Sequence, residues 1–177
     1  MKTILACLAV LATMVLASSA VCAAWTPTTL TTFGSSQTLA LTPSYAGSGP
    51  FHYEYDLTNP TTGGEPISGF TLTFPTAVPV SSFTNITGPA GWDIVVFPRF
   101  NYVDWNQNTG TGLYPGHTMS FSFTSSFEPS STPVVWAGAF TGMGFSGRTY
   151  GPIPEPASVL ALVAGLLCFA GLRLRRK

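Results

Sequence analysis

Hydrophobic and polar residues alternate in several short segments along the middle of the chain. In the clearest, residues 51–57 (FHYEYDL), aromatic and leucine positions alternate with His52, Glu54 and Asp56. This period of two predicts a strand with one face buried and the other in water. Comparable patterns predict further strands at residues 38–41, 70–74, 78–83, 93–97, 99–105, 119–124 and 133–140.

Turn-forming residues separate these segments, as at residues 59–64 (NPTTGG). No stretch of this region carries a helical apolar period over ten residues. About seven or eight strands at such spacing are typical of two packed sheets. We therefore predict an all-β body over residues 25–140: a single antiparallel β-sandwich, immunoglobulin-like or jelly-roll-like, between an N-terminal signal helix and a C-terminal transmembrane helix. Residues 141–152 hold four glycines and are expected to form a flexible linker.

The first 24 residues have the layout of a secretory signal peptide. Lys2 supplies the positive charge, residues 4–16 the apolar core, and residues 17–24 the small side chains of a cleavage region. Cleavage after Ala20, Ala23 or Ala24 fits this layout, and we favour Ala23 or Ala24. An uncleaved anchor is an alternative, for which the apolar core is short.

All three cysteines lie in the terminal segments: Cys7, Cys22 and Cys168. The body therefore has no disulfide, thiolate metal site or cysteine nucleophile of its own. Lipoprotein processing at Cys22 competes with ordinary cleavage, but it is disfavoured because Val21 stands where such signals carry a small residue.

The last 25 residues, 153–177, have three parts in a fixed order. The tripeptide Pro154, Glu155, Pro156 comes first, and its prolines favour an extended chain. Residues 157–172 form an uncharged apolar run, expected to be helical and lipid-soluble. The chain then ends in a basic tail made of Arg173, Arg175, Arg176 and Lys177. Such a tail stays on the cytoplasmic side of a membrane.

The apolar run is short for a membrane span. Its sixteen residues give roughly 24 Å of helix against a hydrocarbon core of about 30 Å. Snorkelling arginines and local thinning can close such a gap. A buried core helix is the alternative, which the adjoining cations disfavour. We expect a transmembrane segment.

This tripartite end resembles the PEP-CTERM sorting signal of exopolysaccharide-producing Gram-negative bacteria. The resemblance covers the last 25 residues by motif, together with the layout of signal peptide and β-rich body. It implies export by the Sec machinery, transit through the inner membrane, and processing near Pro154, Glu155 and Pro156 by an exosortase, a membrane enzyme. The implied destination is the cell surface or the extracellular matrix of a biofilm, with exopolysaccharide as a candidate partner. The alternative is a permanently membrane-anchored, periplasm-facing carbohydrate-binding module.

The distribution of charged residues along the chain indicates which classes of binding partner to expect. The chain has seven basic and seven acidic residues, but five of the basic ones lie in the terminal segments. The body keeps Arg99 and Arg148 against six carboxylates, a net charge of −4. Nucleic-acid binding requires clustered Lys and Arg and is therefore not expected.

We expect no enzyme activity, catalytic residue, metal or cofactor. His52, Glu54 and Asp56 share one side of a strand and could begin a metal site, but a single strand supplies no closing ligands. A solvated strand face is the expectation. Asp104 has no evident carboxylate partner for glycoside hydrolysis. Neither a nucleophile elbow nor a phosphate-binding glycine loop is present.

Tryptophans are the candidate ligand-binding residues of the body. Trp92 and Trp105 lie in loop-like contexts, where their rings could stack on sugars. The competing interpretation is that large aromatics, Trp92 and Trp136 among them, fill the core. In residues 133–140, Trp136 is in phase with Val134 and Phe140.

Overall fold

The computed structural model describes residues 23–32, 36–60, 65–141 and 144–154, in which the regular structure is β except for one short 3-10 helix. In chain order the elements are β1 (Ala23–Ala24), β2 (Thr28–Thr32), β3 (Thr38–Ala46), β4 (Phe51–Thr58), β5 (Gly69–Thr73), η1 (Val80–Ser82), β6 (Thr84–Thr87), β7 (Trp92–Phe97), β8 (Tyr102–Gln107), β9 (Thr118–Ser125), β10 (Glu128–Pro129), β11 (Val135–Phe140), β12 (Gly144–Thr149) and β13 (Pro152–Ile153).

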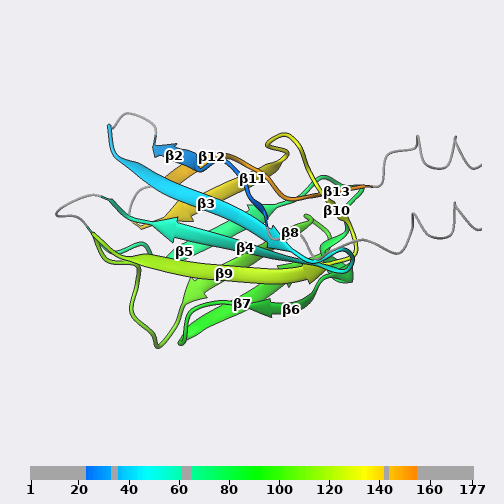
Figure 1. Cartoon of the computed structure of the whole chain (residues 1–177). Helices are drawn as coiled ribbons and strands as arrows, with labels where there is room; N and C mark the ends of the chain where they lie inside the picture. The colour runs from blue at the N-terminus through cyan, green and yellow to red at the C-terminus, as the bar shows by residue number, and fades with distance from the viewer. Residues whose placement is uncertain (1–22, 33–35, 61–64, 142–143, 155–177) are drawn as a thin grey trace, which may run out of the picture.

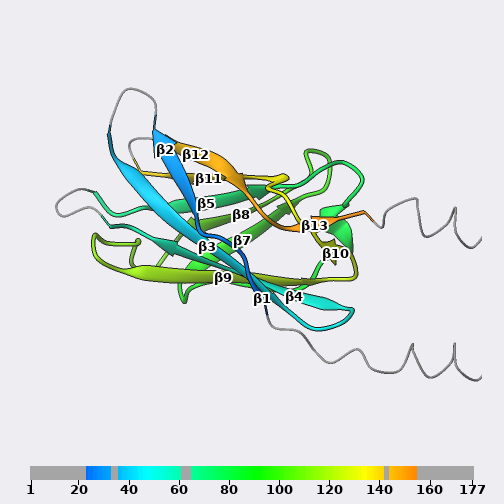
Figure 2. The same cartoon turned by 45° about the horizontal axis from the view of Figure 1, so that its top comes forward.

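Within these residues, eleven strands form one antiparallel sheet in the order β6-β9-β4-β3-β2-β12-β11-β5-β8-β7, with β1 paired to β3. β10 and β13 form a separate pair. The sheet curls so that the half with β3, β4 and β9 lies over the half with β11, β5 and β8 (Figure 1, Figure 2). Trp105, on β8, donates a hydrogen bond to the carbonyl of Thr87 on end strand β6 (3.0 Å), so the sheet is nearly closed. The prediction of an all-β, antiparallel body is confirmed.

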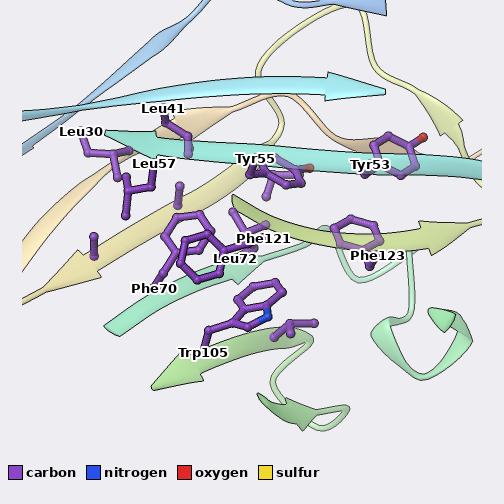
Figure 3. Packing of buried hydrophobic residues seen from close by; sticks show 14 of the residues in the cluster. Leu30, Leu41, Tyr53, Tyr55, Leu57, Phe70, Leu72, Trp105, Phe121 and Phe123 are labelled. Atoms are coloured by element: carbon purple, nitrogen blue, oxygen red, sulfur yellow. The ribbon is translucent and has the colours of Figure 1, made fainter. Parts of the chain in front are cut away.

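Aromatic rings from the two halves meet in the core (Figure 3). Phe121 on β9 packs against Phe70 on β5 and Trp105 on β8, with ring centroids 4.6 and 5.5 Å apart. On β4, Tyr53 and Tyr55 are fully buried and the polar residues between them point outward, which confirms the alternation predicted for residues 51–57. Burial of such rings is the main stabilising contribution in a domain of this size.

The prediction of a strand at residues 78–83 is wrong. This segment forms a turn and η1, and the strand follows at β6. The cause is Asn101, whose left-handed backbone (φ 56°) aims its buried side chain at the turn. Its Nδ2 donates to the carbonyls of Phe74, Pro75 and Val78, and its Oδ1 accepts from the N–H of Val80 (2.7–3.1 Å). One amide thus replaces the ladder bonds that a strand would have made.

Replacing Asn101 with alanine should lower the free energy of unfolding by about 3 kcal/mol, because several buried backbone groups would lose their partner. The measurement is guanidinium denaturation followed by near-ultraviolet circular dichroism. Asn108→Ala is the matched control: its amide bonds Asp93 at an exposed site (2.9 Å), so the expected change is within about 0.5 kcal/mol. Equal losses in the two variants would contradict the assigned role.

The prediction of a flexible linker at residues 141–152 is also wrong for the part of that segment that the structure describes. Residues 144–149 form β12, paired with β11 and β2, and β13 pairs with β10. Two of the glycines here serve close packing: a Cβ on Gly147 would lie 2.8 Å from the Thr29 carbonyl oxygen, and one on Gly151 would lie 2.5 Å from the Val135 side chain. The folded body therefore continues beyond residue 140 to Ile153.

Trp25 joins the two ends of the described chain. Its ring stacks on Tyr150 (5.4 Å between centroids, 14° between planes), and its Nε1 donates to the carbonyl of Ser130 (3.0 Å). Its backbone N–H donates to the carbonyl of Pro43. Residues that follow the predicted cleavage region and residues that precede Pro154 therefore lie at the same end of the body (Figure 2).

Candidate functional site

The predicted terminal signals lie almost wholly outside the described residues. Pro154 is described and directly follows β13, whereas Glu155, Pro156, the apolar run 157–172 and the predicted signal peptide up to residue 22 are not. The same holds for the basic tail of Arg173, Arg175, Arg176 and Lys177. Among the helices of the described residues, none has the length and apolar character to cross a membrane.

The two tryptophans considered for ligand binding are core residues. Trp105 is 0% exposed and Trp92 is 7% exposed. Each indole N–H is used inside the body, by the carbonyl of Thr87 for Trp105 and of Thr111 for Trp92, both at 3.0 Å. The loop placement expected for them is corrected: both lie on strands, and neither offers a ring face on which a sugar could stack.

The polar side of β4 faces outward, as predicted. Glu54 and Asp56 stand opposite serines and a threonine of β3 and β9, and Asp56 accepts a hydrogen bond from Ser120 (2.5 Å). His52 is exposed at the start of the strand. Over the described residues, His, Cys, Asp and Glu do not gather in threes around a point that could hold a metal ion.

An exposed aromatic cluster lies instead on the outward side of the other sheet half. Cross-strand pairing brings Trp136 on β11, Thr73 on β5, Tyr102 on β8 and Phe97 on β7 into one row. Phe100, in the turn between β7 and β8, stacks on Tyr102 (6.3 Å, 22°). We call Trp136, Tyr102, Phe97 and Phe100 the outer aromatic face. Trp136 and Phe100 are 49% and 62% exposed.

The exposure of Trp136 overturns, for this residue, the competing interpretation that Trp92 and Trp136 fill the core. On β11 the inward positions are Val135, Ala137 and Ala139, while Trp136 points out. The reason is space: the opposite half already fills the interior with rings such as Phe121, so small side chains fit beneath β11. Trp136 and Phe140 do share one side of the strand, as their phase predicted, but that side faces outward.

A row of polar side chains runs beside the aromatic one. Thr71, Asp104 and Asn106 lie on the same outward side of β5 and β8. Thr71 Oγ1 donates to Asp104 Oδ1 (2.5 Å), and Asn106 Nδ2 donates to Oδ2 (2.6 Å). These bonds hold the carboxylate of Asp104 in a fixed orientation. Each of its oxygens still has lone-pair capacity for a further donor.

Both arginines of the body also lie on this side. The guanidinium of Arg148 on β12 lies over the Trp136 ring (4.8 Å), and that of Arg99 lies over the Phe100 ring (5.6 Å). Cation–π contacts of this kind keep a guanidinium positioned while its N–H groups face water. The outer aromatic face thus carries a positive group at either end.

Sequence reasoning considered Trp136 only as a residue that could fill the core, and it did not connect Trp136 with Tyr102 or Phe97. One signal was available: Tyr102 and Trp105 are an odd number of residues apart, so they point to opposite sides of a strand. No family model, curated protein or solved structure matches this chain. Chemically, the arrangement places three kinds of group on one surface: aromatic rings, the two guanidinium groups, and the Asp104 carboxylate, which is held in position to accept hydrogen bonds from hydroxyl groups.

Proposed function

We propose that the chain is an exported, non-enzymatic surface or extracellular-matrix protein, sorted through its C-terminal tripeptide, transmembrane segment and basic tail. An exosortase-type enzyme at the inner membrane would process it near Pro154, Glu155 and Pro156 after Sec-dependent export. The body would be the delivered cargo. We class it as a β-sandwich, since its two sheet halves pack face to face, although they remain parts of one curled sheet.

The observation that carries this proposal is the order of parts at the C-terminus: a folded strand, a proline-flanked carboxylate, an apolar run and a cluster of cations. Cations behind an apolar run resist translocation and so hold the chain in the membrane. Prolines keep the preceding segment extended and poor in backbone hydrogen bonds, as a processing enzyme requires of a peptide substrate.

The fold adds one constraint. β13 ends at Ile153, directly before Pro154, and pairs with β10 at only two positions. An enzyme that grips several extended residues around the tripeptide would have to release β13 from β10. Such a short pairing costs little to open, because the ends of domains are the least protected parts of a fold. Processing is therefore compatible with an intact body.

The test replaces the tripeptide in the native host, through Pro154→Gly, Glu155→Ser and Pro156→Gly together. We expect the wild-type product to lack the basic tail and to leave the membrane fraction. The variant should keep the tail and remain in the membrane. Intact-mass spectrometry of fractionated cells measures both properties. Pro133→Ser, at an exposed loop proline, is the matched control and should behave as wild type.

Two results would count against sorting. A variant with the same mature mass and secretion as wild type would remove the tripeptide from the mechanism. A wild-type product that retains Arg173 to Lys177 in the membrane would instead favour the permanently anchored, periplasm-facing alternative.

A further inference from the structure

We infer that the outer aromatic face binds an acidic polysaccharide, with sugar rings stacked on Trp136 and Tyr102 and sugar carboxylates paired with Arg148 and Arg99. This assigns a surface and a ligand class to the exported body. It rests on the proposed export, which brings the body to a matrix, but it does not depend on how the C-terminus is processed.

The first support is the shape of the apolar surface. The rings form a narrow row in which register places Trp136 of β11, Thr73 of β5, Tyr102 of β8 and Phe97 of β7 side by side; Trp136 is exposed, whereas Tyr102 and Phe97 are half-buried. Neighbouring strands lie about 4.8 Å apart, so Trp136 and Tyr102, two strands apart, are separated by roughly 10 Å. One sugar unit of an extended polysaccharide is about half that long, so such a chain could place alternate units over the two rings. Aromatic faces stack well on the apolar C–H faces of such rings.

The second support is the polar row at the side of the rings. A sugar presents hydroxyl groups at its edge when its face lies on an aromatic ring. Asp104 is suited to accept from them, because Thr71 and Asn106 fix both of its oxygens. Thr71 and Asn106 are half-buried, so they hold this position without excluding a ligand from the carboxylate. A ligand site typically combines apolar faces with a few positioned polar groups in this way.

Charge selects an acidic polymer rather than a neutral one. Arg148 and Arg99 are the arginines of the body, and each lies over a ring of this face rather than at a distant site. Guanidinium groups bind carboxylates through paired N–H donors. The same outward side also carries the carboxylates of Asp104 and Asp93, so attraction of an acidic polymer would be confined to the two arginines at the ends of the face.

The binding experiment uses the mature protein as its host exports it, with a neutral detergent for any variant that remains in the membrane fraction. The probes are polygalacturonate, alginate and hyaluronate, with dextran and a β-glucan as neutral comparators, in affinity electrophoresis and calorimetry. We expect retention by at least one acidic polymer, tighter than by either neutral one and weaker as salt increases. Trp136→Ala should weaken that binding about tenfold or more.

The matched control is Tyr114→Ala, which removes an exposed ring (50% exposed) from a loop outside the register of this face. It should bind as wild type. Arg148→Gln combined with Arg99→Gln should weaken acidic-polymer binding and reduce its salt dependence, while circular dichroism stays unchanged.

Any of three results would overturn the inference. These are no retention by the three acidic polymers, equal retention by the neutral ones, or binding that survives Trp136→Ala. A fourth, in which Trp136→Ala abolishes dimers in analytical ultracentrifugation and no polymer binds, would assign the face to self-association instead. The tripeptide variant separates the two proposals, because it should lose sorting and keep polymer binding.

Discussion

Replacing Trp105 with alanine should lower the free energy of unfolding by roughly 4–5 kcal/mol, the largest single-residue loss expected in the body. The side chain is fully buried, and its ring packs on Phe70 (5.7 Å) and Phe121 (5.5 Å). Its indole N–H also reaches the carbonyl of Thr87. The substitution would therefore open a cavity between the sheet halves and leave one end of the nearly closed sheet without its hydrogen bond.

Trp136→Ala provides a control with the same change of residue. Trp136 is half exposed, and its assigned contact is the cation–π interaction with Arg148, so its loss should cost less than about 1 kcal/mol. Guanidinium denaturation of wild type and both variants measures the difference. A loss below about 1.5 kcal/mol for Trp105→Ala would show that the core tolerates its removal, and would contradict the packing described for it.

The period of two in the sequence was sufficient to predict the all-β class and most of the longer strands. The prediction for residues 51–57 is correct because one side of β4 faces the core and the other faces water, so the burial pattern follows the sequence pattern. The elements that were missed lack that contrast. β12 reads GFSGRT, and its glycines were taken for flexibility although Gly147 permits close packing against β2. Close approach between strands distant in sequence leaves no local pattern.

The prediction of a strand at residues 78–83 failed for a different reason. Val78, Val80 and Phe83 are all buried, so their apolar character was read correctly, but the backbone there bonds to the Asn101 side chain and within its own turns. A side chain about twenty residues away along the chain decides the structure, and intrinsic strand preference cannot report that.

The candidate site was predicted least well, because exposure depends on which layer faces which. Trp105 and Trp136 are both large and apolar, and the sequence alone does not tell which of them lies inside. In the structure, the interior is filled by rings from β4, β5, β8 and β9, so β11 supplies small side chains inward and its tryptophan outward. The outer aromatic face follows from this packing. Its pairing of Trp136 with Tyr102 could be recognised only once strand order was known.

Raising the pH should unfold the body through its two buried tyrosines. Burial raises the pKa of Tyr53 and of Tyr55 well above the usual value, and the nearby Tyr45 and Glu128 add to the effect on Tyr53. Both hydroxyls donate inside the fold, Tyr53 to the carbonyl of Phe127 (2.6 Å) and Tyr55 to that of Tyr150 (3.0 Å). In the unfolded chain both would ionise near pH 10.

The direction of the change in stability with pH follows from which state, folded or unfolded, keeps the two tyrosine protons. Above about pH 10 the unfolded chain loses two protons that the folded body retains, so stability falls by up to about 1.4 kcal/mol per pH unit for each tyrosine. Their contribution is fully present below pH 10 and should be reduced by about 4 kcal/mol near pH 11.5. Denaturation midpoints between pH 8 and 11.5 measure this decline.

Two variants identify the source of that alkaline loss. Tyr53→Phe combined with Tyr55→Phe should be about 2 kcal/mol less stable at neutral pH, since two hydrogen bonds are removed, yet show a flatter decline above pH 10. Tyr114→Phe, at an exposed position away from these buried hydroxyls, is the control and should keep the wild-type slope. Constant wild-type stability up to pH 11.5 would mean that Tyr53 and Tyr55 ionise without unfolding, and that the carbonyls of Phe127 and Tyr150 do not require a protonated partner.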